Sequence, residues 1–239
     1  MSFPLSKTLA RLRSRGVTEV VSEWWRHLRE WAYSNEELIF LARPTRLDGG
    51  GRFAEAGRAA GLTLHEATTA DGPDYEKWIG TDSAATFASR LTDDTKCWLV
   101  RKEGRVVHGT WTSTGPAWTR EIRRYFVPPP GAAYVYESFT RADARGLGVY
   151  PFALESIAEE LGGRGVERLL VGVEGGNVPS QRAITKAGFD PAFSLRYGRR
   201  AGVLRLRAAT GAEAGLARQI LLRKPPDHKG GMQAQRGKR

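Results

Sequence analysis

The chain has 239 residues, 41% of them hydrophobic, and a formal net charge of +11. This is enough apolar material for one large core, and it includes no run of about 18 apolar residues that could span a membrane. The start, Met1–Lys7, lacks the apolar segment of a signal peptide, and the single cysteine, Cys97, excludes an internal disulfide. We therefore expect a cytoplasmic protein in which Cys97 is a buried structural thiol.

The excess of basic charge lies at the two ends of the chain. Residues 1–31 hold a net charge of +3 and residues 218–239 hold +6, which leaves only +2 for residues 32–217. A middle region that is nearly neutral does not favour a nucleic-acid-binding domain. We expect any contact with nucleic acid to be weak and to involve the C-terminal tail.

The N-terminal residues are predicted to be helical. Residues 17–31 carry an apolar stripe that includes Trp24 and Trp31. A basic helix with tryptophans can lie on a membrane surface. Three glutamates dilute the basic face, however, so that we favour packing against the rest of the chain or against a second protomer, which would make a homodimer.

Three regions are expected along the chain. Residues 1–50 would form a helical extension and linker, because a short apolar run that we interpret as an edge strand, 37–42, is followed by Gly-Gly-Gly near residue 50. Residues 51–222 would form the catalytic domain. Residues 223–239 are basic, lack aromatic side chains and are expected to be disordered.

The first half of the domain alternates between strand and helix patterns. We expect a strand at 62–67, short helices at 73–79 and 83–91, and a hairpin of strands 96–101 and 105–112 around Glu103-Gly104. The aromatic side chains that follow would line an acceptor pocket or pack in the core; they are Trp111, Trp118 and Tyr125.

The second half has the sharpest pattern. A strand is predicted at 134–140, a helix at 149–161, a buried strand at 169–173 and a second helix at 177–189. A final hairpin is expected from 192–197 and 202–207, followed by one or two helical turns within residues 216–222.

The turn before the helix at 149–161 has the features of an anion site. The free N–H groups of a helix start favour negative charge, Gly146 and Gly148 leave room for a ligand at the backbone, and Arg145 adds a positive charge. These features favour a pyrophosphate, although an ordinary strand-to-helix turn can also hold two glycines. A dinucleotide fingerprint fits poorly, because Pro151 occupies the place of its third glycine.

Two motifs in this half resemble those of the GNAT acetyltransferase superfamily. Arg145-Gly-Leu-Gly-Val149 is similar to its coenzyme A turn, in the variant that continues with Tyr-Pro, and Asn177-x-x-Ser180 with Lys186-Ala-Gly-Phe189 is similar to its second signature. The resemblance covers about residues 62–207. It implies an α/β (α+β) fold with a mixed, mostly antiparallel sheet flanked by helices, which here would carry the helical N-terminal extension.

The resemblance also implies a donor and a binding site. The donor would be acetyl-CoA, with no metal, and the backbone near Phe139 would polarise the thioester carbonyl. The residues implied to contact the coenzyme are Phe139, Thr140, Arg145, Gly146, Leu147, Gly148, Val149, Tyr150 and Asn177. One departure matters: many members carry a tyrosine seven residues after the Asn, where it protonates the leaving thiolate, and this chain has Ile184.

Acyl transfer to an amine needs a group that takes the proton of the ammonium. Glu137 lies on the strand that leads into the turn, and burial there would bring a carboxylate into the range of a useful base. A carboxylate that only pairs with an arginine is the alternative, and His108 and Glu174 are competing bases. No His, Cys or Asp cluster has the spacing of metal ligands.

Three functions follow from these interpretations. The first is N-acetylation of a small amine such as an amino sugar or an amino-acid derivative. The second is acylation of a protein or of an RNA-associated amine with the basic tail as a docking element. The third is a coenzyme A-binding module without catalysis, which the residue at 184 would explain.

Overall fold

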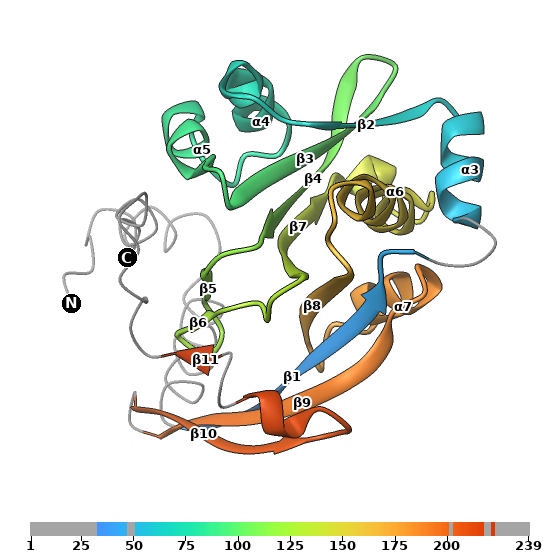
Figure 1. The fold of residues 1–239 in the computed structure, drawn as a ribbon. Coiled ribbons are helices and arrows are strands. Elements are labelled where there is room, and N and C mark those ends of the chain that lie inside the picture. The colour runs from blue at the N-terminus through green and yellow to red at the C-terminus, as the bar shows by residue number, and fades with distance from the viewer. Residues whose placement is uncertain (1–32, 47–50, 201–202, 218–220, 223–239) are drawn as a thin grey trace, which may run out of the picture.

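A computed structural model describes residues 33–46, 51–200, 203–217 and 221–222 (Figure 1). Within them, eight strands form one sheet in the order β10-β9-β1-β8-β7-β4-β3-β2, and three short strands form another in the order β11-β6-β5. The strands of the large sheet are β1 (Tyr33–Pro44), β2 (Leu62–Glu66), β3 (Thr95–Lys102), β4 (Arg105–Ser113), β7 (Ala132–Thr140), β8 (Arg168–Glu174), β9 (Asp190–Arg200) and β10 (Val203–Thr210). The small sheet consists of β5 (Ala117–Thr119), β6 (Arg124–Phe126) and β11 (Leu221–Leu222). The helices are α3 (Arg52–Ala59), α4 (Gly72–Trp78), α5 (Ala84–Arg90), α6 (Val149–Gly163) and α7 (Val178–Lys186), with short 3-10 turns η1 (Thr69–Asp71), η2 (Ala142–Ala144) and η3 (Ala214–Leu216).

The large sheet is covered on both faces. Helix α6 lies across one face and buries Phe152, Leu154 and Ile157 in a cluster that also holds Val135 of β7 (Figure 1). Helices α4 and α5 and the small sheet cover the other face, where Phe87 and other aromatic side chains pack together. Burial of each such large side chain contributes about 1.5–3 kcal/mol, so that the two clusters hold the layers together.

The predicted mixed, mostly antiparallel sheet flanked by helices is confirmed. Among the described strands, β7 and β8 form the one parallel pair, and every other pair in the large sheet is antiparallel. The predicted helix–strand–helix block after the glycine turn appears as α6, β8 and α7 within a few residues of the expected bounds. The predicted hairpin around Glu103 is also present, with Glu103 at φ 50° and Gly104 at φ 75°.

The expectation of an edge strand at 37–42 is wrong. Strand β1 pairs with β8 on one side and with β9 on the other, so that it lies inside the sheet. Leu38 and Phe40 are buried on one face, and Leu41 is buried on the opposite face. The boundary expected near residue 50 therefore does not separate the sheet from everything that precedes it, because β1 is integral to the sheet.

Other expectations had mixed outcomes. The helical turns expected within 216–222 are wrong at Leu221–Leu222, which form the short strand β11; Ala217 is helical, and residues 218–220 lie outside the described residues. Cys97 and Trp111 are fully buried core residues, whereas Trp118 is partly exposed and packs edge-on against Tyr125. The helices predicted in residues 1–32 and the tail at 223–239 lie outside the described residues.

Candidate functional site

The parallel pair β7–β8 opens into a crevice. The two strands are paired from Ala132 and Arg168 up to Val135 and Val171, and beyond that point each continues without the other, β7 to Thr140 and β8 to Glu174. Each strand is followed by a helix, α6 after β7 and α7 after β8. The carboxyl ends of two diverging parallel strands, flanked by helix N-termini, form the position where open α/β sheets bind ligands.

The turn between β7 and α6 provides free backbone donors at this crevice. Gly146 and Gly148 have φ angles of 78° and 75°, a conformation that side chains disfavour. A Cβ at Gly146 would meet no atom within 4 Å, so that the backbone there is open to a ligand. Gly148 is the N-cap of α6 and supplies no capping side chain, which leaves the first N–H groups of the helix for an anion.

The side chains of the turn divide into an outer and an inner set. Arg145 is exposed and its Nε donates to Thr140 O at 3.1 Å, which keeps its charge beside the turn. Leu147 is 63% exposed, whereas Val149 is buried. Tyr150 points inward, with its ring 5.3 Å from that of His108, and burial raises the pKa of its phenol to about 12.

A β-bulge interrupts β7 where the crevice begins. The register between β4 and β7 shifts between Gly109 opposite Phe139 and Trp111 opposite Tyr136, and Glu137 has φ 47°. A bulge re-aims the side chains of the bulged strand and disrupts the ladder locally. The expectation that Glu137 is buried is wrong, because the bulge turns its side chain outward, where it is 47% exposed.

The buried guanidinium of Arg90 holds Glu137 in place. Its Nη2 lies 2.6 Å from Glu137 Oε2 and its Nη1 lies 2.5 Å from Asp82 Oδ2, while the guanidinium covers the ring of Trp111 at 4.0 Å. Burial alone would lower the pKa of Arg90, but Glu137, Tyr136 and Asp82 outweigh it and raise the pKa above its usual value. Glu137 Oε1 has no partner among the described residues, so that one carboxylate oxygen stays available to accept a proton.

The two competing bases are placed differently. His108 is fully buried beneath α6; its Nδ1 lies 2.8 Å from Thr140 Oγ1, and its Nε2 has no partner among the described atoms. Burial lowers the pKa of His108 to about 3, so that the ring is neutral near pH 7 and a weak proton acceptor. Glu174 is exposed at the end of β8, on the far side of the crevice from Glu137.

The remaining predicted residues lie around the same crevice. Phe139 is partly buried, with the guanidinium of Arg145 5.9 Å from its ring. Asn177 caps α7, because its Oδ1 accepts from Ser180 N at 3.2 Å. Ile184 is 1% exposed and packs under α7, so that this position offers no proton to a leaving group.

The sequence did not single out Arg90 or Asp82. They lie at the end of α5 and in the turn before it; Asp82 pairs with Arg90, and the contact of Arg90 with Glu137 joins parts of the chain 47 residues apart. The Ala-rich pattern of 84–90 predicts a helix but gives no signal for the partner of its last residue. Among the described residues, no group of His, Cys, Asp and Glu could hold a metal ion, and no helix is long and apolar enough to cross a membrane.

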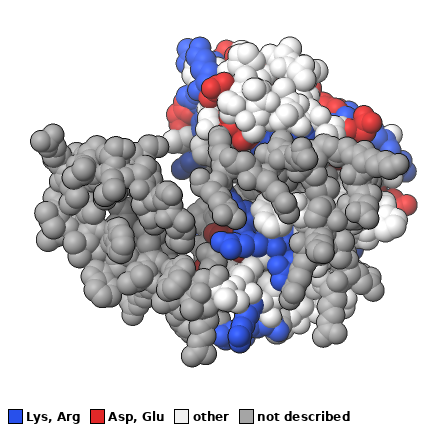
Figure 2. Space-filling view, turned by 90° about the vertical axis from the view of Figure 1, so that its left-hand side faces the viewer, with Lys and Arg blue, Asp and Glu red and all other residues white. Residues whose placement is uncertain are grey.

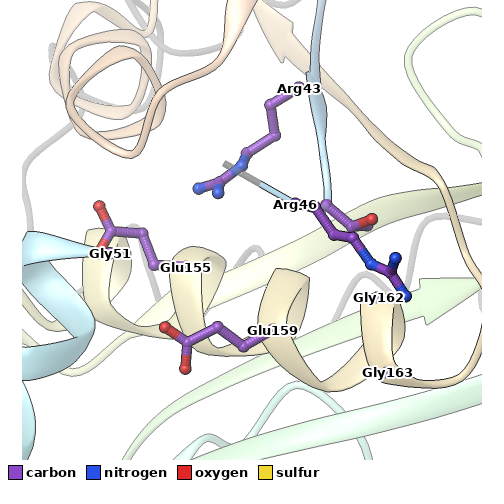
Figure 3. A pocket seen from close by; sticks show the side chains of 8 residues that line it. Arg43, Arg46, Gly51, Glu155, Glu159, Gly162 and Gly163 are labelled. Carbon is purple, nitrogen blue, oxygen red and sulfur yellow. The ribbon is translucent and has the colours of Figure 1, made fainter. Parts of the chain in front are cut away.

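A second hollow lies away from the crevice, beside the middle and end of α6 (Figure 3). It has a volume of about 300 Å³ and is lined by charged residues that include Arg43 and Glu155. Arg43 Nη1 donates to Ala187 O at 2.5 Å, and Glu155 Oε2 accepts from the N–H groups of Phe53 and Ala54 at 2.7 and 2.8 Å. Glu155 therefore caps the start of α3, which has no side-chain cap of its own. The charged side chains of Arg43 and Glu155 at this hollow are thus accounted for by bonds that stabilise the fold.

Figure 2, seen from the left-hand side of Figure 1, shows basic and acidic side chains next to one another over the upper part of the described surface and mainly basic ones in its lower part.

Comparison with known proteins gives matches in structure only. No family model and no curated protein sequence matches the chain. Among solved structures, it is similar to a protein from Novosphingobium aromaticivorans named for the GNAT family of acetyltransferases, with a TM-score of 0.47 and 16% identity over 69% of this chain and 63% of that chain. It is also similar to the ribosomal-protein-S18-alanine N-acetyltransferase of Escherichia coli, with a TM-score of 0.44 and 17% identity over 59% of this chain and 95% of that one.

A third similar structure is an aminoglycoside acetyltransferase from an uncultured soil metagenomic sample, with a TM-score of 0.43 and 11% identity over 53% of this chain and 87% of that one. All three are similarities of fold at low identity. The chain spans less than two thirds of the length of the Novosphingobium protein.

Proposed function

We propose that the chain is an N-acetyltransferase of the GNAT type, which transfers the acyl group of acetyl-CoA directly to the primary amine of a small molecule. One observation carries this proposal: the bulge of β7, the glycine turn and the start of α6 lie together along one side of the crevice where β7 and β8 diverge. The free N–H groups of the turn can bind a pyrophosphate. The bulge lies a few residues upstream, where the side chains that it re-aims would surround the reacting groups.

The donor would be held mainly by backbone. The N–H groups at the start of α6 would take the pyrophosphate of coenzyme A, with the charge of Arg145 beside it, and the outward face of Gly146 leaves room for it. The backbone near Phe139 would polarise the thioester carbonyl. Asn177 would contribute indirectly, because its side chain caps α7 on the other side of the crevice.

Glu137 is the proposed general base. Its free Oε1 would take a proton from the incoming ammonium, so that the neutral amine can form the new C–N bond as the C–S bond to coenzyme A breaks; the nitrogen then gives up its second proton to water, and water protonates the thiolate. Its Oε2 stays bonded to Arg90, which fixes the carboxylate at the bulge. The thiolate would leave without a proton from position 184, where the side chain is that of isoleucine.

Two other functions remain as outcomes of a test. The buried Ile184 favours a coenzyme A-binding module without catalysis. A basic tail at 223–239 would favour an acceptor on a protein or near RNA. A cytoplasmic location also remains a proposal.

Release of coenzyme A from acetyl-CoA, measured over a panel of primary amines, tests the proposal. We expect turnover with at least one small amine and an acetylated amine as the product. Binding of coenzyme A without turnover on any small amine or lysine peptide would favour the binding module instead. Absence of binding would reject the donor site itself.

A further inference from the structure

The hollow beside α6 holds two buried charges of opposite sign that do not touch. Arg43 of β1 is 4% exposed, Glu155 of α6 is 5% exposed, and both line the hollow (Figure 3). Among the described residues, no carboxylate oxygen lies within 4 Å of a nitrogen of Arg43. Burial lowers the pKa of Arg43, and the charge of Glu155 opposes this from a distance.

The bonds that stabilise the fold use only part of each side chain. Arg43 donates through Nε to Pro44 O and through Nη1 to Ala187 O, while its Nη2 makes no bond within the described structure. Glu155 accepts both of its bonds at Oε2, which leaves Oε1 without a donor. Neither free atom is among the unpartnered atoms that the described structure seals from solvent. Arg43 Nη2 and Glu155 Oε1 are therefore open to the hollow.

This arrangement indicates a group that would lie between the two side chains. A buried charge is costly unless a counterion or hydrogen bonds compensate it. The hollow has a volume of about 300 Å³, whereas one water needs roughly 10–15 Å³ of such a volume. The space therefore suits a small molecule rather than a single bridging water.

The other lining residues repeat the separation of charge. Arg46, just after β1, is exposed and makes no ion pair with a described residue. Glu159 follows Glu155 by one turn of α6 and bonds Arg58 through Oε2 at 3.0 Å. The two arginines thus come from the β1 side and the two glutamates from α6 (Figure 3). Two cations and two anions balance, which favours a ligand without net charge.

We propose that this hollow binds a small α-amino acid in its zwitterionic form, with the carboxylate on the guanidinium of Arg43 and the ammonium on Oε1 of Glu155. The planar guanidinium matches the geometry of a carboxylate, and a carboxylate oxygen accepts from an ammonium. A simple anion or a simple amine would pair with one of these residues and leave the other unpaired. The volume lies at the lower end of the range for small-molecule sites, about 300–1,000 Å³.

The site is independent of the proposed transfer reaction, because the hollow lies away from the crevice. Arg43 also holds the carbonyl that follows α7, and Glu155 also holds the start of α3. A bound amino acid would therefore link β1 with α6 where both already contact other helices. Ligands that bind only the folded state raise its stability, so that melting temperature reports on occupancy.

Thermal unfolding of the full chain with each of the twenty common L-amino acids tests the proposal. At about 10 mM, we expect at least one to raise the melting temperature by about 3 °C or more, which corresponds to a Kd of about 1 mM or tighter. The amino acid with the largest effect is then titrated by calorimetry beside two derivatives. Its α-amide lacks the carboxylate and its N-acetyl form lacks the ammonium, and each should bind at least tenfold more weakly.

Matched variants assign the binding to this hollow. Glu155→Gln keeps an oxygen for the N–H groups at the start of α3 but lacks the charge for an ammonium, and it should weaken binding at least tenfold. Arg58→Gln breaks the exposed pair with Glu159 from outside the hollow and should change the affinity less than twofold. Glu137→Gln, at the crevice, should also bind as the wild type does.

The proposal is overturned if none of the twenty amino acids binds, or if either derivative binds as well as the free amino acid. Equal affinities of folded Glu155→Gln and the wild type would also reject it. Binding that weakens in Glu137→Gln but not in Glu155→Gln would place the amino acid at the crevice instead. If Glu155→Gln does not fold, the two derivatives decide. None of these failures bears on coenzyme A binding, which calorimetry measures separately.

Discussion

The neutral state of His108 predicts a specific loss of stability in acid. The ring is fully buried, its Nδ1 contacts Thr140 Oγ1, and burial lowers its pKa from 6.5 to about 3. In the unfolded chain the same histidine would take up a proton near pH 6.5. As pH falls from 6.5 toward 3, the unfolded state therefore binds a proton that the folded state refuses, and folding becomes less favourable.

The size of the effect follows from this difference. Each pH unit within the window costs up to about 1.4 kcal/mol, and the slope is half of that at pH 6.5, so that about 2 kcal/mol of unfolding free energy is lost between pH 6.5 and pH 4.5. The substitution His108→Gln removes the titration and leaves a polar group that can still bond Thr140. Other groups with lowered pKa values, Glu66 and Asp71, titrate in both proteins and cancel in the comparison.

Urea unfolding from pH 7 to pH 4.5 measures the difference. The free energy of unfolding of the wild type should fall by about 2 kcal/mol more than that of His108→Gln as pH falls. Parallel curves would refute the buried neutral histidine. They would also return His108 to the list of candidate bases, because an ordinary pKa would suit it to that role.

Three further perturbations test other parts of the structure. Gly148→Glu should weaken binding of coenzyme A at least a hundredfold, because several N–H bonds to a charged group, each worth about 1.5–3 kcal/mol, would be lost. The control Gly163→Glu, at an open position at the far end of α6, should leave the affinity unchanged. Equal affinities of the two folded variants in calorimetry would remove the donor assignment. Glu155→Ala should destabilise the chain by about 1–3 kcal/mol in urea unfolding, since the N–H groups at the start of α3 lose their acceptor; a change under about 0.5 kcal/mol would contradict the capping role. Deletion of residues 225–239 should leave the melting temperature and small-amine turnover unchanged and reduce any affinity for RNA; a melting temperature lower by several degrees would show that the tail packs.

Periodic segments of the chain were predictable because their local patterns agree with their final environment. The stripe of α6 faces the sheet, and glycines stand where the chain needs a positive φ before that helix. Strand β1 was misplaced for a physical reason. Its unbroken apolar run, Leu38–Ala42, indicates burial on both faces and hence an inner strand, whereas an edge strand usually alternates or carries charges.

The environment of Glu137 could not be read from the sequence. The aromatic residues Tyr136 and Phe139 close to it predict burial, but the bulge between β4 and β7 turns the side chain out of the sheet. The bulge depends on pairing between strands, and the partner Arg90 comes from a different helix. Non-local contacts of this kind leave no periodic trace in the chain.

The pH dependence of acetyl transfer by Glu137→Gln tests most directly whether the bulge of β7 is a reaction centre. The variant keeps the shape of the side chain and an oxygen for Arg90, but it has no proton acceptor. We expect turnover to fall by about 10² to 10⁴ with the affinity for coenzyme A near that of the wild type, and we expect the acidic limb of the rate to disappear. Full activity with an unchanged pH profile would contradict the account and move the base to Glu174 or His108.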